Sequence, residues 1–246
     1  MKAMVLAAGL GTRLRPLTND RPKALVEISG HTLLEITLRR LASFGIREVI
    51  VNVHHFADMV VDYLKENNNF GMRIEISRED VLLDTGGGLK KAAWFFLKGG
   101  NPEPFLIHNA DVISAIDLDQ ILKAHRETNA LAMLAVQNRS TSRYLLFDEH
   151  NQLCGRRAGD GPPEMVRPAK KTDAFAFSGI HVISPHLLSM MTEEGTFSII
   201  TTYVRLAAQG ERISAFRADE YYWRDLGKPE SITQAAKDIG TGAVRI

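Results

Sequence analysis

Cysteine is almost absent from the 246-residue sequence, which contains only Cys154. No disulfide can form within the chain, and neither a cysteine-based zinc site nor an iron–sulfur cluster can be built from it alone. This composition is typical of a reducing compartment and predicts a cytoplasmic protein. Cys154 stands in a charged segment without an identifiable catalytic partner, so we do not expect it to act as a nucleophile.

An excess of charge of one sign is also missing. The 30 lysine and arginine side chains nearly cancel 29 acidic ones, which leaves a formal charge of +1. This balance argues against a general nucleic-acid surface. Long apolar runs are missing as well, because Gly9 and Gly11 interrupt the N-terminal MKAMVLAAGLG and Arg13 and Arg15 follow it. We therefore expect no membrane association and read this segment as a buried strand.

The first half of the sequence alternates between strand and helix patterns. An apolar run without period-two alternation predicts a buried strand at 2–8, and further strands are expected at 48–53, at 73–77, where Ile74 and Ile76 share a face, and at 105–108. Thr32 is placed to cap a helix that Gly45 ends, and further helices are expected at 57–67 and 90–97. This order predicts an α/β fold with a Rossmann-like, mixed and mostly parallel sheet flanked by helices.

The second half has a different pattern, with more strands and only short helices. We expect strands at 131–136, 144–147, 175–183 and 213–217, and helices near 185–191, 201–208 and 230–237. The Gly-, Pro- and charge-rich stretch 155–171 is interpreted as a substrate-side loop or hairpin. No linker composition separates two cores, so residues 1–246 are expected to form one domain. An exposed apolar edge in this half could pair two subunits, so a homodimer is one expected possibility.

A glycine-rich loop follows the first strand. Leu14 stands where a dinucleotide-binding loop needs its third glycine, and the Gly-Lys-Ser/Thr of a Walker loop is absent. Two glycines remain that let backbone N–H groups approach a ligand. Cations gather behind them at Arg13, Arg15, Arg21 and Lys23, a concentration that suits a polyphosphate. The alternative is a glycine-rich turn with a solvated basic face.

Several motifs together resemble a known family. They are LAAGLGTRLRPLT and RPKALVEISG near the N-terminus, followed by VNVHH, DTGGGLKKA, NADV, FSGIHVISP and WRDLGKPE. In order and spacing the chain resembles the sugar-1-phosphate nucleotidyltransferases. Its length and TGGG element are most similar to the compact bacterial N-acetylmuramate 1-phosphate uridylyltransferases and mannose-1-phosphate guanylyltransferase-like proteins. The resemblance implies the nucleotide-diphospho-sugar transferase fold, with a nucleotide-binding half at about 1–112 and a sugar-phosphate-binding half at about 113–246.

The activity implied by the resemblance is the reaction of an NTP with a sugar 1-phosphate, which gives an NDP-sugar and pyrophosphate. UTP is favoured and GTP comes next, and the product class is a cell-wall or polysaccharide precursor. The alternative is a catalytically inactive module on the same fold that binds nucleotides or nucleotide sugars for regulation. A Rossmann oxidoreductase is disfavoured by Leu14.

Such a transfer needs no enzyme nucleophile, because an oxygen of the sugar phosphate attacks the α-phosphorus. The protein has to position the substrates and neutralise charge, which predicts cations on the triphosphate and one or two carboxylates on Mg²⁺. Asp111 follows the strand 105–108 and Asp225 follows an aromatic run, so these two are the candidate metal ligands. Taken singly, either could instead be a turn or helix-cap residue.

The resemblance also assigns nucleotide contacts and catalytic roles. Arg13 would hold the triphosphate, Lys23 would contact the reacting phosphates, and with Asp111 they form the catalytic set. The remaining nucleotide contacts are expected in the glycine loop and beside the base, at Ala8, Gly9, Gly11, Thr12, Asp84, Thr85, Gly86 and Gly87.

On the acceptor side, Asn109 and Gly179 would lie beside the sugar. The chain departs from larger family members here, since Val166-Arg167-Pro168 stands in the region of their Glu-Lys-Pro element. Arg167, or else Lys170 or Lys171, is therefore expected to bind the sugar phosphate.

Overall fold

The computed structural model describes residues 1–99 and 103–246. In this part of the chain, ten strands form one sheet whose main order is β11-β10-β9-β12-β6-β1-β4-β5, with β8 paired to β12 and β13 paired to β8. None of the helices in these residues is both long and apolar enough to cross a membrane.

Parallel strands make up the first half of the sheet. β1 (Lys2–Leu6) lies between β4 (Glu48–Val53) and β6 (Phe105–Asn109), and β5 (Arg73–Arg78) pairs with β4. The connecting helices are α1 (Leu33–Ser43), α2 (Ala57–Glu66) and α3 (Asp84–Leu97). The predicted elements are found here with two changes of bounds. β1 ends at Leu6, so that Ala7 and Ala8 belong to the loop, and α3 begins at Asp84 rather than at residue 90.

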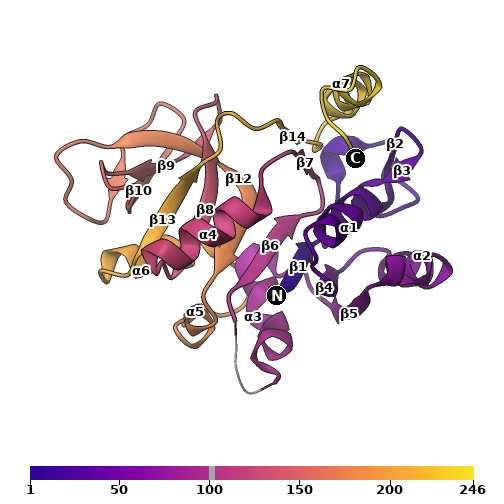
Figure 1. The fold of residues 1–246 in the computed structure, drawn as a ribbon, viewed down its shortest axis with the longest axis horizontal. Helices are drawn as coiled ribbons and strands as arrows, with labels where there is room; N and C mark the ends of the chain where they lie inside the picture. The colour runs from indigo at the N-terminus through magenta and orange to yellow at the C-terminus, as the bar shows by residue number, and fades with distance from the viewer. Residues whose placement is uncertain (100–102) are drawn as a thin grey trace.

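Antiparallel pairing dominates the second half. The long strand β12 (Asp173–Ile183) pairs antiparallel with β6, β8 (Ala132–Gln137) and β9 (Arg143–Phe147). β9 continues into a hairpin with β10, and that hairpin projects at one end of the molecule in Figure 1. The remaining elements of this half are α4 (Leu118–Thr128), β10 (Leu153–Ala158), β11 (Glu164–Met165), α5 (His186–Ser189), α6 (Ile199–Ala208) and β13 (Ile213–Arg217).

Two apolar cores cover the two faces of the sheet. Ala3 and Val5 of β1 pack in one core with residues of α1, α2 and α4. Met4, between them in sequence, packs in the other with residues of α3, α5 and α6. β1 contributes to both cores because successive residues of a strand face opposite sides. Each core combines residues from before and after position 112. The result is a three-layer α/β architecture, which confirms the expected fold class.

A small additional unit, outside the three layers, lies over the carboxyl end of β6. β7 (Val112–Ser114) pairs antiparallel with β14 (Trp223–Asp225), and α7 (Pro229–Gly240) follows. The short strands β2 (Glu27–Ile28) and β3 (His31–Thr32) pair beside it. Leu14, Leu33 and Leu226 are fully or almost fully buried in the core that joins these pieces. This unit carries the end of the glycine loop and the candidate aspartate Asp225.

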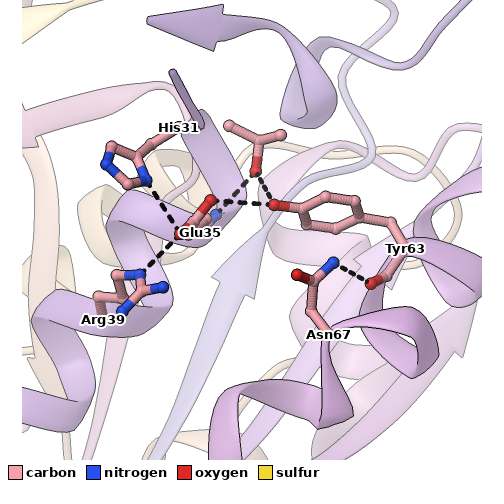
Figure 2. A network of polar contacts seen from close by, with 6 residues as sticks. His31, Glu35, Arg39, Tyr63 and Asn67 are labelled. Carbon is pink, nitrogen blue, oxygen red and sulfur yellow. Dashed lines mark hydrogen bonds and ion pairs between the residues drawn. The ribbon is translucent and has the colours of Figure 1, made fainter. Parts of the chain in front are cut away.

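The start of α1 is fixed by a polar network. Thr32 caps the helix as predicted, since its Oγ1 accepts a hydrogen bond from Glu35 N at 3.1 Å. The Glu35 carboxylate accepts hydrogen bonds from Arg39 Nε at 2.7 Å and from Tyr63 OH at 3.1 Å, and His31 Nδ1 lies 3.0 Å from it (Figure 2). Burial raises the pKa of Glu35, but these hydrogen bonds outweigh it and hold the pKa below 4.5. The network joins α1 to α2.

Cys154 does not lie in a charged loop as expected. It is fully buried in β10, and burial raises the pKa of its thiol. This environment suppresses the thiolate, so the expectation that Cys154 is no nucleophile rests on burial rather than on loop position.

Candidate active site

A cavity of about 420 Å³ opens at the carboxyl ends of β1, β4 and β6. Ligands of parallel α/β sheets gather at this edge. The glycine loop forms one side of the cavity from Ala7 to Arg13. Polar side chains from further along the chain complete it, namely Lys23, Asn52, Asp84, Thr85, Asn109 and Asp111.

Buried side chains of neighbouring segments hold the glycine loop in place. Ala7 N donates to Asn52 Oδ1 at 2.8 Å, and Asn52 in turn donates to Glu79 Oε1 at 2.7 Å. Gly11 has a φ of +66°, and a Cβ there would lie 2.9 Å from Cγ2 of Thr18 and 3.1 Å from Cβ of Lys23. Glycine is therefore required for the loop to fold back onto Lys23.

Lys23 and Asp111 form an ion pair at the floor of this cavity. Lys23 begins a short 3-10 helix after Pro22, and Asp111 lies between β6 and β7. Their side chains are only 12% and 23% exposed. The pair joins two segments 88 residues apart in sequence, which is why neighbourhood in the sequence does not reveal it.

Asp225 reaches the same place through strand pairing. It lies opposite Val112 in the β14–β7 ladder, and Leu226 N donates to the Asp111 carbonyl oxygen at 2.8 Å. Asp225 Oδ1 accepts from Gly227 N at 3.0 Å. A Cβ on Gly227 would lie 2.5 Å from Arg13 Nη2 and 2.7 Å from Asp225 Oδ1. The missing side chain at this glycine thus leaves room for Arg13 beside Asp225.

The two aspartates suit a magnesium ion. Asp111 Oδ1 and Asp225 Oδ2 have no hydrogen-bond partner among the residues the structure describes. Mg²⁺ takes oxygen ligands, needs only one or two protein carboxylates and keeps several waters. Within the described ranges, this site included, no group of three or more metal-ligating side chains forms.

A second cavity of about 710 Å³ adjoins the first. The two share the lining residues Leu6, Asp84, Thr85 and Asn109. Its far wall is the β9–β10 hairpin and its near wall includes the first turn of α6. A ligand in the first cavity therefore has direct access to a partner in the second.

Four residues expected at the ligand are used for packing within the chain. A Cβ on Gly86 would lie 2.4 Å from the Phe197 ring, one on Gly87 2.5 Å from the Gly195 carbonyl oxygen, and one on Gly179 2.7 Å from Asn109 Nδ2. Arg167 N donates to the Cys154 carbonyl oxygen at 3.1 Å, and this arginine is absent from the linings of both cavities.

The segment that follows α5 is linked directly to the start of α3. Gly86 N donates to the Phe197 carbonyl oxygen at 2.9 Å, and Ile199 N donates to Thr85 Oγ1 at 3.0 Å. The close approach that the TGGG element permits is thus made by another part of the same chain. Asp84 and Thr85 remain on the cavity wall.

Arg139 is a residue that the sequence did not single out. Its guanidinium carbon lies 3.7 Å from the centre of the Trp223 ring, and its Nη2 donates to the Phe177 carbonyl oxygen at 2.8 Å. Burial lowers the pKa of Arg139, and the nearby Asp225 carboxylate opposes this effect. Arg139 thus adds a positive charge near Asp225. No motif marks it, because tertiary folding brings it there.

Two buried histidines lie on the strands where the halves meet. His108 on β6 and His181 on β12 have pKa values lowered by burial to about 4 and about 3. His181 Nδ1 contacts Tyr203 OH, and His108 Nδ1 lies 2.8 Å from the Asn109 carbonyl oxygen. Both are neutral at neutral pH. His181 lines the second cavity, whereas His108 lines neither.

The glycine loop, the cations Arg13 and Lys23 and the two aspartates gather at the carboxyl ends of the strands, the edge at which α/β proteins bind their ligands. A family model described as nucleotidyl transferase matches residues 2–242. The chain therefore belongs to the nucleotidyl transferase family.

Curated relatives and solved structures agree with this membership. The chain is 36% identical over 240 residues to the N-acetylmuramate alpha-1-phosphate uridylyltransferase of Caulobacter vibrioides, covering 93% of each protein. It is 30% identical to the mannose-1-phosphate guanyltransferase of Yarrowia lipolytica over 94% of this chain and 61% of that relative. The crystal structure of HddC from Yersinia pseudotuberculosis complexed with GMP-PN matches 97% of the chain and 99% of its own with a TM-score of 0.76 at 21% identity, which shows the shared fold.

Proposed function

We propose that the protein transfers a nucleotidyl group from an NTP to a sugar 1-phosphate and releases pyrophosphate. The observation that carries this proposal is that Arg13, Lys23 and Asp111 line one cavity that adjoins a second, with Asp225 held beside Asp111 by the pairing of β14 with β7. We favour UTP over GTP, since the relative covered at 93% of its length is named as a uridylyltransferase and that covered at 61% as a guanyltransferase. N-acetylmuramate 1-phosphate is accordingly the first acceptor to test.

The proposed reaction forms one bond and breaks one. An oxygen of the sugar phosphate bonds to the α-phosphorus, and the bond from that phosphorus to the bridging oxygen of the leaving pyrophosphate breaks. The acceptor oxygen is already anionic, so the chain need not supply a nucleophile or a base. Its part is to hold both substrates in line and to neutralise charge.

The residues of the first cavity divide this work. Backbone N–H groups of the loop that contains Gly9 and Gly11 approach the triphosphate. Arg13 and Lys23 balance the charge that builds up on the phosphates during transfer. Asp84 and Thr85 stand on the wall where the base lies, and Asn109 on the wall toward the sugar.

Asp111 and Asp225 would hold Mg²⁺. When bound, this ion supplies positive charge to the phosphate oxygens. The ion pair with Lys23 orients the Asp111 carboxylate.

A panel of NTPs and sugar 1-phosphates, with pyrophosphate release as the readout, tests the proposal. UTP with at least one acceptor should give turnover that needs Mg²⁺. Asp111→Asn and Asp225→Asn should each lower kcat about 100-fold or more, a typical cost of removing a group that acts on the transition state. Asp62→Asn is the matched control, because that aspartate is 67% exposed on α2.

Two outcomes would contradict the proposal in different ways. Binding of an NTP without pyrophosphate release from any pair would favour the inactive regulatory module. Turnover that survives both aspartate substitutions would show that the metal assignment is wrong.

A further inference from the structure

The hairpin wall of the second cavity carries positive charge that the chain does not neutralise. Arg143, Arg156 and Arg157 all line this cavity. Arg156 is paired with Glu164, with Nε 2.7 Å from Oε2. Neither Arg143 nor Arg157 has a carboxylate partner in the part of the chain that the structure describes. Two cations therefore face the cavity.

Arg157 is the better positioned of the two. It is half-buried, while Arg143 is exposed. Its guanidinium carbon lies 5.0 Å from the centre of the Tyr144 ring. Its Nε is buried and has no hydrogen-bond partner among the described residues. A guanidinium held against an aromatic ring loses little freedom when it binds, and a buried N–H without a partner favours a ligand that accepts a hydrogen bond.

The hairpin is distant from the reacting phosphates. These belong beside Arg13, Lys23 and Asp111, in the segments that follow β1 and β6. β6 pairs with Ile180–Ile183 of β12, whereas β9 pairs with Asp173–Phe175 at its other end, and β10 lies one strand beyond β9. The five residues from Phe175 to Ile180 alone span about 16 Å of extended chain. A sugar whose 1-phosphate lies at the first cavity therefore turns its other end toward Arg157.

We propose that Arg157, assisted by Arg143, binds an anionic substituent of the acceptor sugar that is remote from its 1-phosphate. This inference rests on the proposed function and adds a substrate class to it. A carboxylate or a second phosphate fits, because both offer oxygens that match the guanidinium fork. Arg157 is thereby a specificity-determining residue, and Glu164 limits the cationic site by occupying Arg156.

The test compares acceptors that differ by one anion. N-acetylmuramate 1-phosphate and N-acetylglucosamine 1-phosphate differ by a lactyl ether carboxylate, and glucose 1,6-bisphosphate and glucose 1-phosphate differ by a phosphate. For each pair the ratio of kcat/KM, anionic over neutral, is measured with UTP. The unmodified protein should prefer at least one anionic member, and the pair that shows it identifies the anion.

Arg157→Met should lower that ratio about 10- to 100-fold, the usual range for a lost charge-assisted hydrogen bond, mainly through KM. Arg157→Lys should retain part of the preference. Arg217→Met is the matched control, since Arg217 also stacks on an aromatic ring, 4.0 Å from the centre of Phe175, but does not line the cavity. Its ratio should stay within about twofold of that of the unmodified protein.

The inference is overturned if the unmodified protein shows no preference for either anionic acceptor, or if Arg157→Met leaves the ratio unchanged. Both results presuppose turnover, so they leave the proposed function standing. The absence of pyrophosphate from every pair would instead overturn the proposed function. Calorimetric binding of N-acetylmuramate against N-acetylglucosamine then tests Arg157 without catalysis, and equal binding of the two sugars would overturn the inference.

Discussion

The two halves of the molecule are built by different rules. Before position 112, parallel strands β1, β4, β5 and β6 bring their carboxyl ends to one edge, and the loops beyond them carry the phosphate-binding residues. After it, β12, β9 and β10 pair antiparallel, and the wall of the second cavity comes from the face of a hairpin. The first half brings its charges together from distant parts of the sequence, as Lys23 and Asp111 show, whereas the second half places its arginines on neighbouring strands of a hairpin.

This difference predicts where substitutions act. Changes in the first half should alter the rate, because the groups there meet the reacting phosphates. Changes in the second half should alter the choice of acceptor, except at Asp225, which the pairing of β14 with β7 brings beside Asp111. Changes at the junction should alter stability. The following predictions run from the largest expected effect to the smallest.

Lys23→Met should lower kcat about 100- to 1000-fold, because it removes a charge from the reacting centre and leaves the Asp111 carboxylate without its partner. Steady-state pyrophosphate release measures the effect, and circular dichroism checks that the protein folds. Lys65→Met on α2, a lysine 71% exposed, should keep its kcat. A change of only a few-fold in Lys23→Met would remove the distinction between the halves.

The junction should be sensitive to acid. Unfolded histidine takes up a proton near pH 6.5, whereas folded His108 and His181 do so only near pH 4 and pH 3. Their contribution is fully present above pH 6.5 and is lost as the pH falls, by roughly 2 kcal/mol for each histidine between pH 6.5 and 5. Urea unfolding at several pH values measures this slope, and His108→Gln should flatten it. An equal slope in the variant would mean that His108 does not contribute to the acid sensitivity.

Gly86→Ala should separate the segments that join the halves. The added Cβ would lie 2.4 Å from the Phe197 ring and 2.9 Å from its carbonyl oxygen, so one of the two segments must move. A cost of about 1–3 kcal/mol is expected in urea unfolding. Gly240→Ala at the end of α7 is the control, because nothing lies within 4 Å of its Cβ position. Equal stability of the two variants would mean that the contact is not tight.

Glu35→Gln should have the smallest effect, a loss of about 1 kcal/mol in stability with kcat unchanged, since its network supports α1 away from the phosphates. The Glu35 pKa lies below 4.5, so its ionised form contributes fully above that pH and less as the pH falls through the folded value. The variant should therefore be less pH-dependent below 4.5 than the unmodified protein. A large drop in kcat would instead connect the network to catalysis.

Much of the first half could be predicted from its sequence because the signals there are local. The strand at 48–53 and the Thr32 cap appear where the apolar pattern and the capping residue place them. α4 was not predicted, although Asp117 marks its start by accepting hydrogen bonds from Asp119 N and Gln120 N. That capping signal, followed by Leu118, Ile121 and Leu122, was available in the sequence.

The candidate site was predictable where a motif names the residue and not where packing decides. Lys23, Asp111 and Arg13 stand in motifs, and the structure brings them to one place. Arg157 and Arg139 have no such mark, because their surroundings come from strand pairing and from Trp223. Glycine is also ambiguous in sequence: the space beside Gly86 is taken by Phe197 rather than left for a ligand.

The hydrogen bonds that join Thr85 and Gly86 to residues 197–199 link the two cavities. Asp84 and Thr85 belong to the walls of both cavities, and this contact fixes them to the start of α6. A substitution that shifts Thr85 should therefore move Ile199, which lines the second cavity. The shapes of the two cavities are mechanically linked at this corner.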